Sequence, residues 1–236
     1  MARTRKEQEY AEKRQEILAV ARRLMLERGY ERITIQDLLS ELKISSGAFY
    51  HYFSSRQALL EGLVESMLED SLAPLLPIVE ARDLSALQKL QGWFDAIDRL
   101  RSGNQRFLVD MLRSWYADDN AIVHQKSEKV LLKQRAPLLG AIVRQGMEEG
   151  IFSTTHPERA GEILLALQQA MGDTHAGFLL QLGRGGGEGE VIEGILSSHA
   201  ATMEAIERVL GAPNGSLRRV EAQEVRTWVA ALREAS

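Results

Sequence analysis

The sequence contains no cysteine among its 236 residues. Disulfides, thiolate metal sites and cysteine nucleophiles are therefore excluded, which is compatible with a reducing cytoplasm. No apolar run reaches the roughly 18 residues that a membrane-spanning helix needs. Residues 1–16 hold no hydrophobic segment and so lack the form of a secretory signal. We therefore expect a cytoplasmic protein without a membrane partner.

Alternation of apolar and polar residues, the pattern typical of a half-buried strand, is also absent, and no internal repeat occurs. Hydrophobic residues make up 44% of the chain and charged residues 26%, as in an ordinary globular protein. Apolar residues recur instead at three- and four-residue spacing. These patterns predict an all-α fold of one or two domains.

Histidines are few, and none stands in a pattern that builds a catalytic or metal site. Neither His-Glu-x-x-His nor Glu-x-x-His occurs. Asp173 and His175 are two residues apart and do not share a helix face, so they are poorly placed to pair. We expect no catalytic residue, no metal and no cofactor. Surface or core hydrogen bonding is the expected role of the later histidines, His124, His156, His175 and His199.

Charge is unevenly distributed along the chain. Residues 1–60 hold 11 Lys and Arg against 8 Asp and Glu, a balance of +3, whereas the remaining residues have a balance of −7. The overall charge of −4 therefore hides a basic N-terminal segment on an acidic body. This asymmetry suits a protein that contacts nucleic acid at one end only.

Residues 34–53, TIQDLLSELKISSGAFYHYF, carry the most specific pattern in the chain. Thr34 and Asp37 have the spacing of a capping box, which starts a helix whose apolar residues follow a single face. Ser45 or Ser46 then offers a second N-cap. Two short helices joined by such a turn form a helix-turn-helix, whose second helix enters the major groove of DNA.

The side chains of this second helix suit contact with DNA. Small residues at its start allow close approach, and its free N–H groups favour phosphate. Tyrosine, histidine and arginine side chains follow and can donate hydrogen bonds to phosphate oxygens. The residues expected to bind a double-stranded DNA operator are Thr34, Ser45, Ser46, Gly47, Ala48, Tyr50, His51, Tyr52 and Arg56.

Simpler interpretations of the same residues stay open. The hairpin is also compatible with an ordinary helical pair and a solvated serine-rich turn, and Phe49 and Phe53 are expected in the core in either case. The basic residues within 3–14 fit a solvated, frayed terminus, or an arm that reaches phosphate or the minor groove.

Residues 10–60 resemble the N-terminal domain of the TetR (tetracycline-repressor-like) regulators. The resemblance implies a ligand-responsive transcriptional repressor that binds a palindromic operator as a homodimer. The rest of the chain matches only in its helical pattern and length. The positions that carry the resemblance are Gly29-Tyr30, Thr34-Ile35, Leu38, Ile44-Ser45, Gly47, Tyr50, Tyr52-Phe53, Arg56 and Leu59-Leu60.

Three positions depart from the family pattern. Lys43 stands in the turn where the family often has glycine, and a left-handed backbone there costs a residue with a side chain about 1 kcal/mol. Tyr52 replaces a frequent histidine and Arg56 a frequent lysine, and both replacements keep a phosphate donor.

Apolar spacing predicts a succession of helices after the helix-turn-helix. The first begins at a capping box between Ser54 and Gln57, and the second is capped by Asp83. Pro137 predicts a kink in a longer, later helix. The predicted helical ranges are 55–72, 84–100, 107–116, 121–149, 157–182, 190–210 and 217–234.

The later helices carry more apolar surface than packing within one chain is expected to cover. We divide the chain into a helix-turn-helix DNA-binding domain at 1–56 and a helical effector-binding and dimerisation domain at 57–236. Helices 157–182 and 190–210 are expected to build a four-helix interface in a homodimer. We expect Met203 and Ile206 in that interface.

Aromatic and sulfur-containing side chains gather in the C-terminal domain, where they fit either a core or a pocket for a small, mostly apolar effector. Such a ligand is expected to shift the helix 55–72 and release DNA. A helical enzyme and a DNA-binding protein without an effector are the alternatives. The residues expected to bind the effector are Met67, Trp93, Phe107, Met111, Trp115, Gln168, Met171, His175 and Phe178.

Overall fold

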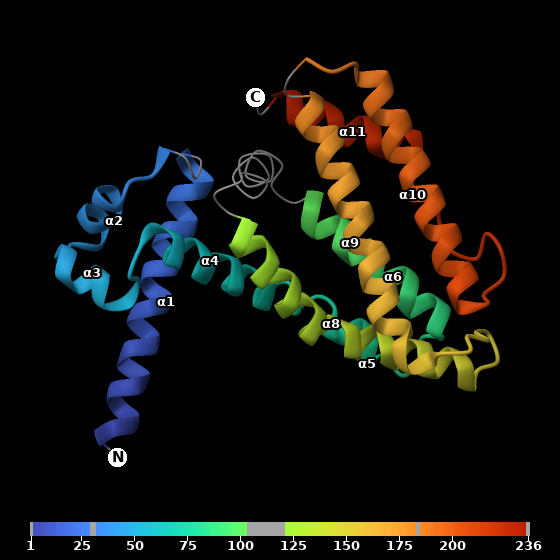
Figure 1. The fold of residues 1–236 in the computed structure, drawn as a ribbon, viewed down its shortest axis with the longest axis horizontal. Coiled ribbons are helices and arrows are strands. Elements are labelled where there is room, and N and C mark those ends of the chain that lie inside the picture. The colour runs from blue at the N-terminus through green and yellow to red at the C-terminus, as the bar shows by residue number, and fades with distance from the viewer. Residues whose placement is uncertain (1, 29–31, 103–120, 183–184, 235–236) are drawn as a thin grey trace. The chain divides into compact units, whose positions relative to one another are not determined.

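The computed structural model describes residues 2–28, 32–102, 121–182 and 185–234. Within these ranges the chain forms helices and connecting segments without a strand, as Figure 1 shows. This confirms the all-α expectation. The helices are α1 (Ala2–Arg28), α2 (Ile35–Leu42), α3 (Ser46–Tyr52), α4 (Arg56–Asp70), α5 (Leu76–Glu80), α6 (Ala86–Ser102), α8 (Ala121–Glu148), α9 (Pro157–Leu182), α10 (Glu188–Leu210) and α11 (Ala222–Glu234).

The chain divides into two compact units. Among the described residues, the N-terminal unit comprises 2–28, 32–70 and 121–127, and the C-terminal unit comprises 71–102, 128–182 and 185–234. The first unit extends past the expected boundary at residue 56 because α4 packs against α1. In the ranges that the structure describes, no helix combines the length and the apolar character needed to cross a membrane.

α1 begins at Ala2, so the basic N-terminal stretch is helical and not a frayed or extended arm. Charge pairs one turn apart support its exposed side; Lys13 Nζ, for example, lies 2.8 Å from Glu16 Oε2. The opposite stripe is buried from Ile17 onward. Because the apolar spacing begins only at Ile17, the sequence pattern did not show that the helix extends back to Ala2.

Apolar side chains of α1, α2, α3 and α4 form the core of the N-terminal unit. Phe49 and Phe53 are enclosed in it, as expected. The buried residues of this core are Ile17, Leu18, Ala21, Leu24, Met25, Ile33, Leu38, Leu39, Phe49, Phe53, Leu59, Leu60, Leu63 and Val64.

Two helix starts differ from the expected ones. Ser55 rather than Ser54 caps α4, because Ser55 Oγ accepts the backbone N–H three residues ahead at 3.0 Å. At α6 the cap is Ser85 instead of Asp83. Ser85 Oγ accepts the N–H of Gln88 at 3.3 Å, and Gln88 Oε1 accepts the N–H of Ser85 at 2.9 Å. Both starts are therefore set by a serine that reaches a free N–H of the first turn.

In the C-terminal unit α8 and α9 meet at two glycines. A Cβ on Gly161 would lie 2.2 Å from the carbonyl oxygen of Ala136 and 2.7 Å from the nitrogen of Gly140, so the two backbones are in contact. α8 stays helical through Pro137, which lies inside this contact region. Because proline has no N–H, one intrahelical hydrogen bond is missing at this turn.

The main core of the C-terminal unit is built by α6, α8, α9 and α10, with Trp93 completely buried in it. Met203 and Ile206 are 1% and 0% exposed and belong to this core, not to a dimer interface. That expectation was wrong because periodicity shows that a helix face is apolar but not what covers it. The cluster comprises Leu75, Ala86, Leu90, Trp93, Phe94, Ala96, Ile97, Ala136, Leu139, Ile142, Val143, Phe152, Ala160, Leu164, Leu165, Met171, Met203, Ile206, Leu210 and Leu217.

The chain after α10 is fastened by a buried carboxylate. Glu207 of α10 is 1% exposed. It accepts the backbone N–H groups of Gly215 and Leu217 at 3.1 and 2.8 Å and two bonds from Arg219 at 3.0 and 2.8 Å. Burial by itself raises the pKa of the Glu207 carboxyl. The bonds from Arg219 and from the two N–H groups outweigh burial and lower that pKa to about 2.

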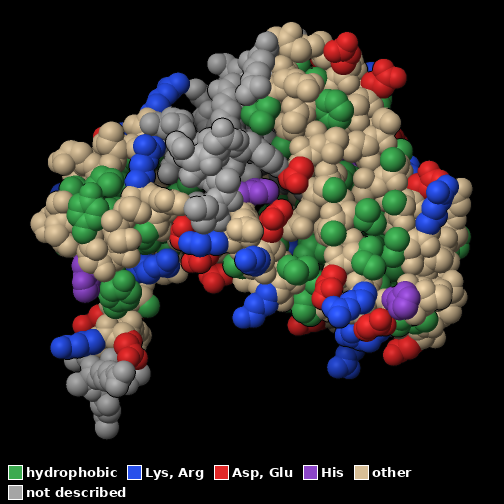
Figure 2. Space-filling view, in the orientation of Figure 1, with side chains coloured by type: hydrophobic (Ala, Val, Ile, Leu, Met, Phe, Trp, Pro, Cys, Tyr) green, Lys and Arg blue, Asp and Glu red, His purple; other side chains and the backbone are tan. Residues whose placement is uncertain are grey.

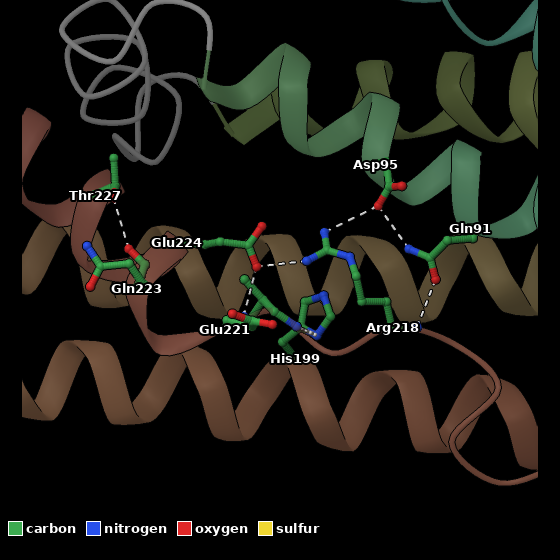
Figure 3. A network of polar contacts seen from close by, with 9 residues as sticks. Gln91, Asp95, His199, Arg218, Glu221, Gln223, Glu224 and Thr227 are labelled. Carbon is green, nitrogen blue, oxygen red and sulfur yellow. Dashed lines mark hydrogen bonds and ion pairs between the residues drawn. The ribbon is translucent and has the colours of Figure 1, made fainter.

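The same segment also reaches α6, as Figure 3 shows. The guanidinium of Arg218 lies 2.7 Å from Glu224 Oε2 and 3.4 Å from Asp95 Oδ1. The backbone N–H of Arg218 donates to Gln91 Oε1 at 2.8 Å. Polar contacts therefore tie the segment between α10 and α11 to both α10 and α6.

α11 adds a second apolar cluster. It begins at Ala222, later than the expected 217, because the preceding residues follow a non-helical path held by polar contacts. His199 Nδ1 accepts the N–H of Val220 at 3.4 Å on this path. The cluster comprises Val191, Ile195, Val220, Val225 and Val229, against which Phe178, Leu179, Leu182, Ile192, Leu196 and Trp228 pack.

Gly161→Ala should destabilise the C-terminal unit, whereas Gly140→Ala should not. A Cβ at 161 overlaps the α8 backbone, and overpacking of this kind costs about 1–3 kcal/mol. A Cβ at 140 meets only Arg144 Nη1, at 3.6 Å, and alanine favours a helix over glycine by about 1 kcal/mol. Urea unfolding measures both variants beside the unchanged chain. An unchanged midpoint for Gly161→Ala would contradict the close contact of α8 with α9.

The fold should lose stability in acid through Glu207. Its pKa lies below the ordinary 4.5 in the folded state, so the carboxylate stabilises the fold above pH 4.5. This contribution disappears as the pH falls toward 2, and it amounts to about 3 kcal/mol. Urea unfolding at several pH values should show a smaller acid loss in Glu207→Gln than in the unchanged chain.

The control for this measurement is Glu204→Gln, which removes the exposed partner of Arg208 on the same helix. It should change the free energy of unfolding by less than about 0.5 kcal/mol and keep the acid loss. Identical acid profiles for Glu207→Gln and the unchanged chain would contradict the assignment.

Candidate functional site

The helix-turn-helix consists of α2, α3 and the turn between them. Thr34 Oγ1 accepts the N–H of Asp37 at 3.1 Å, and Asp37 Oδ2 accepts the N–H of Thr34 at 2.8 Å, which is the predicted capping box. The Thr34 hydroxyl also donates to Asp37 at 2.6 Å. Hydrogen bonds from the Thr34 side chain and backbone lower the pKa of Asp37. Both donors of Thr34 are therefore used inside the cap.

The turn has the left-handed backbone for which the sequence analysis gave the cost at Lys43. Lys43 follows α2 with φ 53°, in the left-handed region, and its N–H donates to the carbonyl of Leu39. Among the residues that the structure describes, Lys43 is the non-glycine residue with a positive φ. The side chain is exposed and forms no ion pair with the described part of the chain. A cation is thus held in the turn that leads into α3.

α3 carries the largest share of the predicted DNA contacts. Ser45 is its N-cap, with Oγ accepting the N–H of Ala48 at 3.2 Å. Phe49 and Phe53 turn inward, and their ring centroids lie 5.9 Å apart. Tyr50 is 48% exposed, and Ala48 and Tyr52 are partly buried. The other residues exposed on this helix are Ser46, Gly47 and His51.

Two more predicted DNA contacts stand at other helix starts. Thr34 precedes α2, and Arg56 is the first residue of α4. Many other cations of the N-terminal unit are engaged by neighbouring carboxylates. These pairs are Arg22 with Asp70, Arg23 with Glu27 and Glu41, and Arg28 with Asp37. The basic surplus of residues 1–60 is therefore partly neutralised within the unit.

α1 supplies two residues near α3, Tyr10 and Arg14, that the sequence analysis did not place beside that helix. The ring of Tyr10 lies 4.8 Å from that of Tyr52. One turn later, the Arg14 guanidinium lies 5.1 Å from the centroid of the Phe53 ring. A signal was available, because Tyr10 and Arg14 continue the stripe of Ile17 toward the N-terminus with helical spacing.

Three of the predicted effector-binding residues meet in the core of the C-terminal unit. Trp93 Nε1 donates to Gln168 Oε1 at 3.0 Å, and this bond joins α6 to α9. Met171, one turn after Gln168, belongs to the same buried cluster as Trp93. His175 is a further turn along α9 and is also buried. Trp93 and Gln168 satisfy each other, so two polar groups are buried here with a partner.

The other predicted effector residues lie elsewhere in the fold or outside its described part. Phe178 belongs to the second apolar cluster and packs on Gly194, where a Cβ would lie 2.4 Å from the ring. Met67 belongs to the N-terminal unit. The residues outside the described ranges are Phe107, Met111 and Trp115.

Comparison with known proteins assigns this architecture to a family. Residues 17–63 match the bacterial regulatory proteins of the tetR family, and residues 109–176 match the tetracyclin repressor-like C-terminal domain. The chain belongs to the TetR family of transcriptional regulators. The first match contains the whole helix-turn-helix, and the second contains the part of α9 that holds Gln168 and Met171.

Curated relatives of this TetR-family chain include repressors. The transcriptional repressor KstR2 of Mycobacterium tuberculosis (strain ATCC 25618 / H37Rv) is 27% identical over 150 residues, which cover 59% of this chain and 69% of KstR2. The repressor DhaR of Mycobacterium sp. (strain GP1) is 28% identical over 157 residues, which cover 66% of this chain and 78% of DhaR. Because the relatives are regulators and not enzymes, the alternative of a helical enzyme is dropped.

A solved structure supports the same fold. The crystal structure of RolR in complex with resorcinol aligns with 95% of this chain and 96% of RolR, with a TM-score of 0.59 and 19% sequence identity. At this identity the likeness establishes the arrangement of helices and not a shared ligand.

Proposed function

We propose that this TetR-family regulator represses transcription in the cytoplasm as a homodimer, which binds a palindromic operator and is released by a small, mostly apolar ligand. The observation that carries DNA binding is α3, a short helix anchored by Phe49 and Phe53 with phosphate donors on its exposed side. KstR2 and DhaR are repressors, which favours repression over activation.

The contacts of α3 and of the start of α4 are assigned from the chemistry of their side chains. Tyr50, Tyr52 and Arg56 carry hydroxyl and guanidinium donors, which suit phosphate oxygens. Three residues are assigned to base edges because they lie on the helix that enters the major groove, namely Ser46, Ala48 and His51. Ser45 and Thr34 are assigned to the two helix caps.

Gly47 supports this placement of DNA. Glycine in a helix costs about 1 kcal/mol relative to alanine. Inside the protein a Cβ at Gly47 would meet only Ser45 Oγ, at 4.0 Å, so packing within the chain does not require glycine. Close approach of an external surface to α3 explains the missing side chain.

The dimer face that we propose is the exposed side of α9 and α10. On α9 the residues Ile163, Ala166 and Ala170 are exposed at helical spacing, and on α10 Ser197 and Ala201 are exposed one turn apart. Figure 2 shows hydrophobic side chains over these helices, with charged ones mainly at the borders. Small side chains let helices of two copies approach closely and form a four-helix bundle. Such a dimer would present two copies of α3 to successive major grooves, about 34–36 Å apart.

The effector site that we propose centres on Trp93, Gln168 and Met171, with His175 as a further polar group. A few polar groups among buried aromatic and apolar side chains are typical of small-molecule sites. The same residues also fit an ordinary core, which would make the chain a DNA-binding protein without an effector. RolR binds resorcinol, so a small phenol is a reasonable first probe.

Arg56→Ala should weaken binding to all DNA sequences alike, because a phosphate contact carries no sequence information. The slope of the logarithm of the binding constant against the logarithm of salt concentration should fall by roughly 0.9. Fluorescence anisotropy measures the affinity and its salt dependence on an operator selected from random duplexes. Arg226→Ala removes the same charge from an exposed position of α11, and should change neither the affinity nor the slope. An altered sequence preference in Arg56→Ala would instead assign Arg56 to a base edge.

Ala170→Glu and Ala201→Glu should each separate the dimer and leave the protomer folded. Both alanines are exposed, so a carboxylate is tolerated in a single chain. Like charges facing each other across a symmetric interface cost several kcal/mol, which raises the dissociation constant of the dimer by about 100-fold or more. Light scattering after size-exclusion chromatography measures the molecular mass and so distinguishes dimer from monomer. Ala230→Glu, on the exposed side of α11, is the control and should remain dimeric. An unchanged chain that is monomeric and still binds its operator would rule this interface out.

Gln168→Leu should remove the response to ligand and leave operator binding intact. Leucine keeps a similar volume but takes away the acceptor of the Trp93 indole, at a cost in stability of about 1–3 kcal/mol. Thermal shift against resorcinol and larger apolar or cationic compounds identifies ligands, and anisotropy measures operator release. Gln181→Leu, at an exposed position of the same helix, should keep the response. If every stabilising compound leaves the DNA affinity of the unchanged chain unaltered, the chain has no effector of this kind.

A further inference from the structure

The last turn of α3, which belongs to the proposed DNA-contacting surface, is not stabilised by α3 alone. A helix of seven residues is too short to be stable alone. Ser45 fixes its start, whereas Phe53 at its end is already extended, with φ −135°. His51 and Tyr52 therefore need support from another element if they are to keep one orientation.

Tyr10 of α1 provides this support. Its ring centroid lies 4.8 Å from that of Tyr52 at an interplanar angle of 31°, and 5.5 Å from that of His51 at 83°. Both distances lie in the range in which aromatic pairs attract each other. The Tyr10 hydroxyl also donates to the carbonyl of His51 at 3.5 Å, and helix ends leave such carbonyls without an intrahelical partner.

The position of Tyr10 distinguishes it from a core residue. Tyr10 is 38% exposed, whereas Ile17, two turns further along the same stripe of α1, is fully buried. One turn after Tyr10, Arg14 lies 5.1 Å from the centroid of the Phe53 ring and 3.7 Å from Glu65. Two successive turns of α1 thus hold three consecutive residues at the end of α3. Two of them, His51 and Tyr52, are proposed DNA contacts.

We propose that Tyr10 is a positioning residue for operator binding, which holds Tyr52 and His51 in the orientation in which they meet DNA. The inference rests on the proposed function and adds a residue outside the helix-turn-helix to it. A side chain that is already ordered in the free protein loses less conformational entropy on binding, and this advantage is about two- to tenfold in affinity for each side chain.

The test uses the full chain and an operator selected from random duplexes. Tyr10→Ala should weaken operator binding about tenfold, because two side chains lose their order. Tyr10→Phe keeps the ring and should stay within about twofold of the unchanged chain. Gln8→Ala, one exposed residue of the same helix that bonds to Glu12, is the matched control and should bind like the unchanged chain. A loss in Tyr10→Phe equal to that in Tyr10→Ala would overturn the role of the ring.

A double-mutant cycle separates positioning from direct contact with DNA. If Tyr10 acts through Tyr52, then Tyr10→Ala should have a clearly smaller effect in a Tyr52→Ala background than in the unchanged chain. Losses that add fully would mean that Tyr10 touches DNA itself, and would overturn the inference. Hydrogen exchange of the free protein gives an independent readout. Residues 46–53 should exchange faster in Tyr10→Ala, and equal exchange would also contradict positioning.

The outcomes distinguish this inference from the function on which it rests. If the unchanged chain binds a selected operator and Arg56→Ala weakens that binding, the proposed function stands. Unchanged affinity of Tyr10→Ala in the same experiment would then overturn the role of Tyr10 alone. If the selection yields no bound sequence for the unchanged chain, the proposed function and the role of Tyr10 fall together.

Discussion

The burial of Phe49 and Phe53 is the constraint on which the proposed DNA-contacting surface depends. α3 is too short to hold itself, and each buried phenyl ring contributes about 1.5–3 kcal/mol when it leaves water. The two rings are four residues apart and so occupy one side of the helix, which directs Tyr50 and His51 away from the core. The spacing that stabilises α3 therefore also decides which side chains face a partner.

The C-terminal unit depends on a different interaction, a charge buried with all its partners. Taking Glu207 out of water costs several kcal/mol, and the two N–H groups and the guanidinium of Arg219 offset that cost. Because Gly215 and Leu217 are both bound to one carboxylate, the segment after α10 is restricted to a single path. Arg218 is then placed beside α6, and α11 begins where it can cover the apolar cluster of α9 and α10.

The local features of this fold could be predicted from the sequence, whereas long-range partners could not. The Thr34–Asp37 capping box is set by two residues within one helical turn, and the structure has it. The pairing of Glu207 with Arg219 joins a helix to a non-helical segment, and no spacing rule describes it. Met203 shows the same limit, since the pattern identified a buried face but assigned it to the wrong neighbour. The place of Tyr10 beside α3 likewise depends on tertiary packing.

The bond between Trp93 and Gln168 restricts which ligands the proposed effector site can accept. Within the core the indole N–H of Trp93 donates to the amide oxygen of Gln168, so this donor and this acceptor are already paired. A purely apolar molecule that separated the pair would leave a donor and an acceptor unpaired, at about 1–3 kcal/mol each. That loss is comparable to the 1–3 kcal/mol by which effectors typically couple to a second site. A molecule with one hydroxyl among apolar atoms can accept from Trp93 and donate to Gln168, and so avoids the loss. If the proposed effector site is correct, it should therefore favour such ligands over hydrocarbons of the same size.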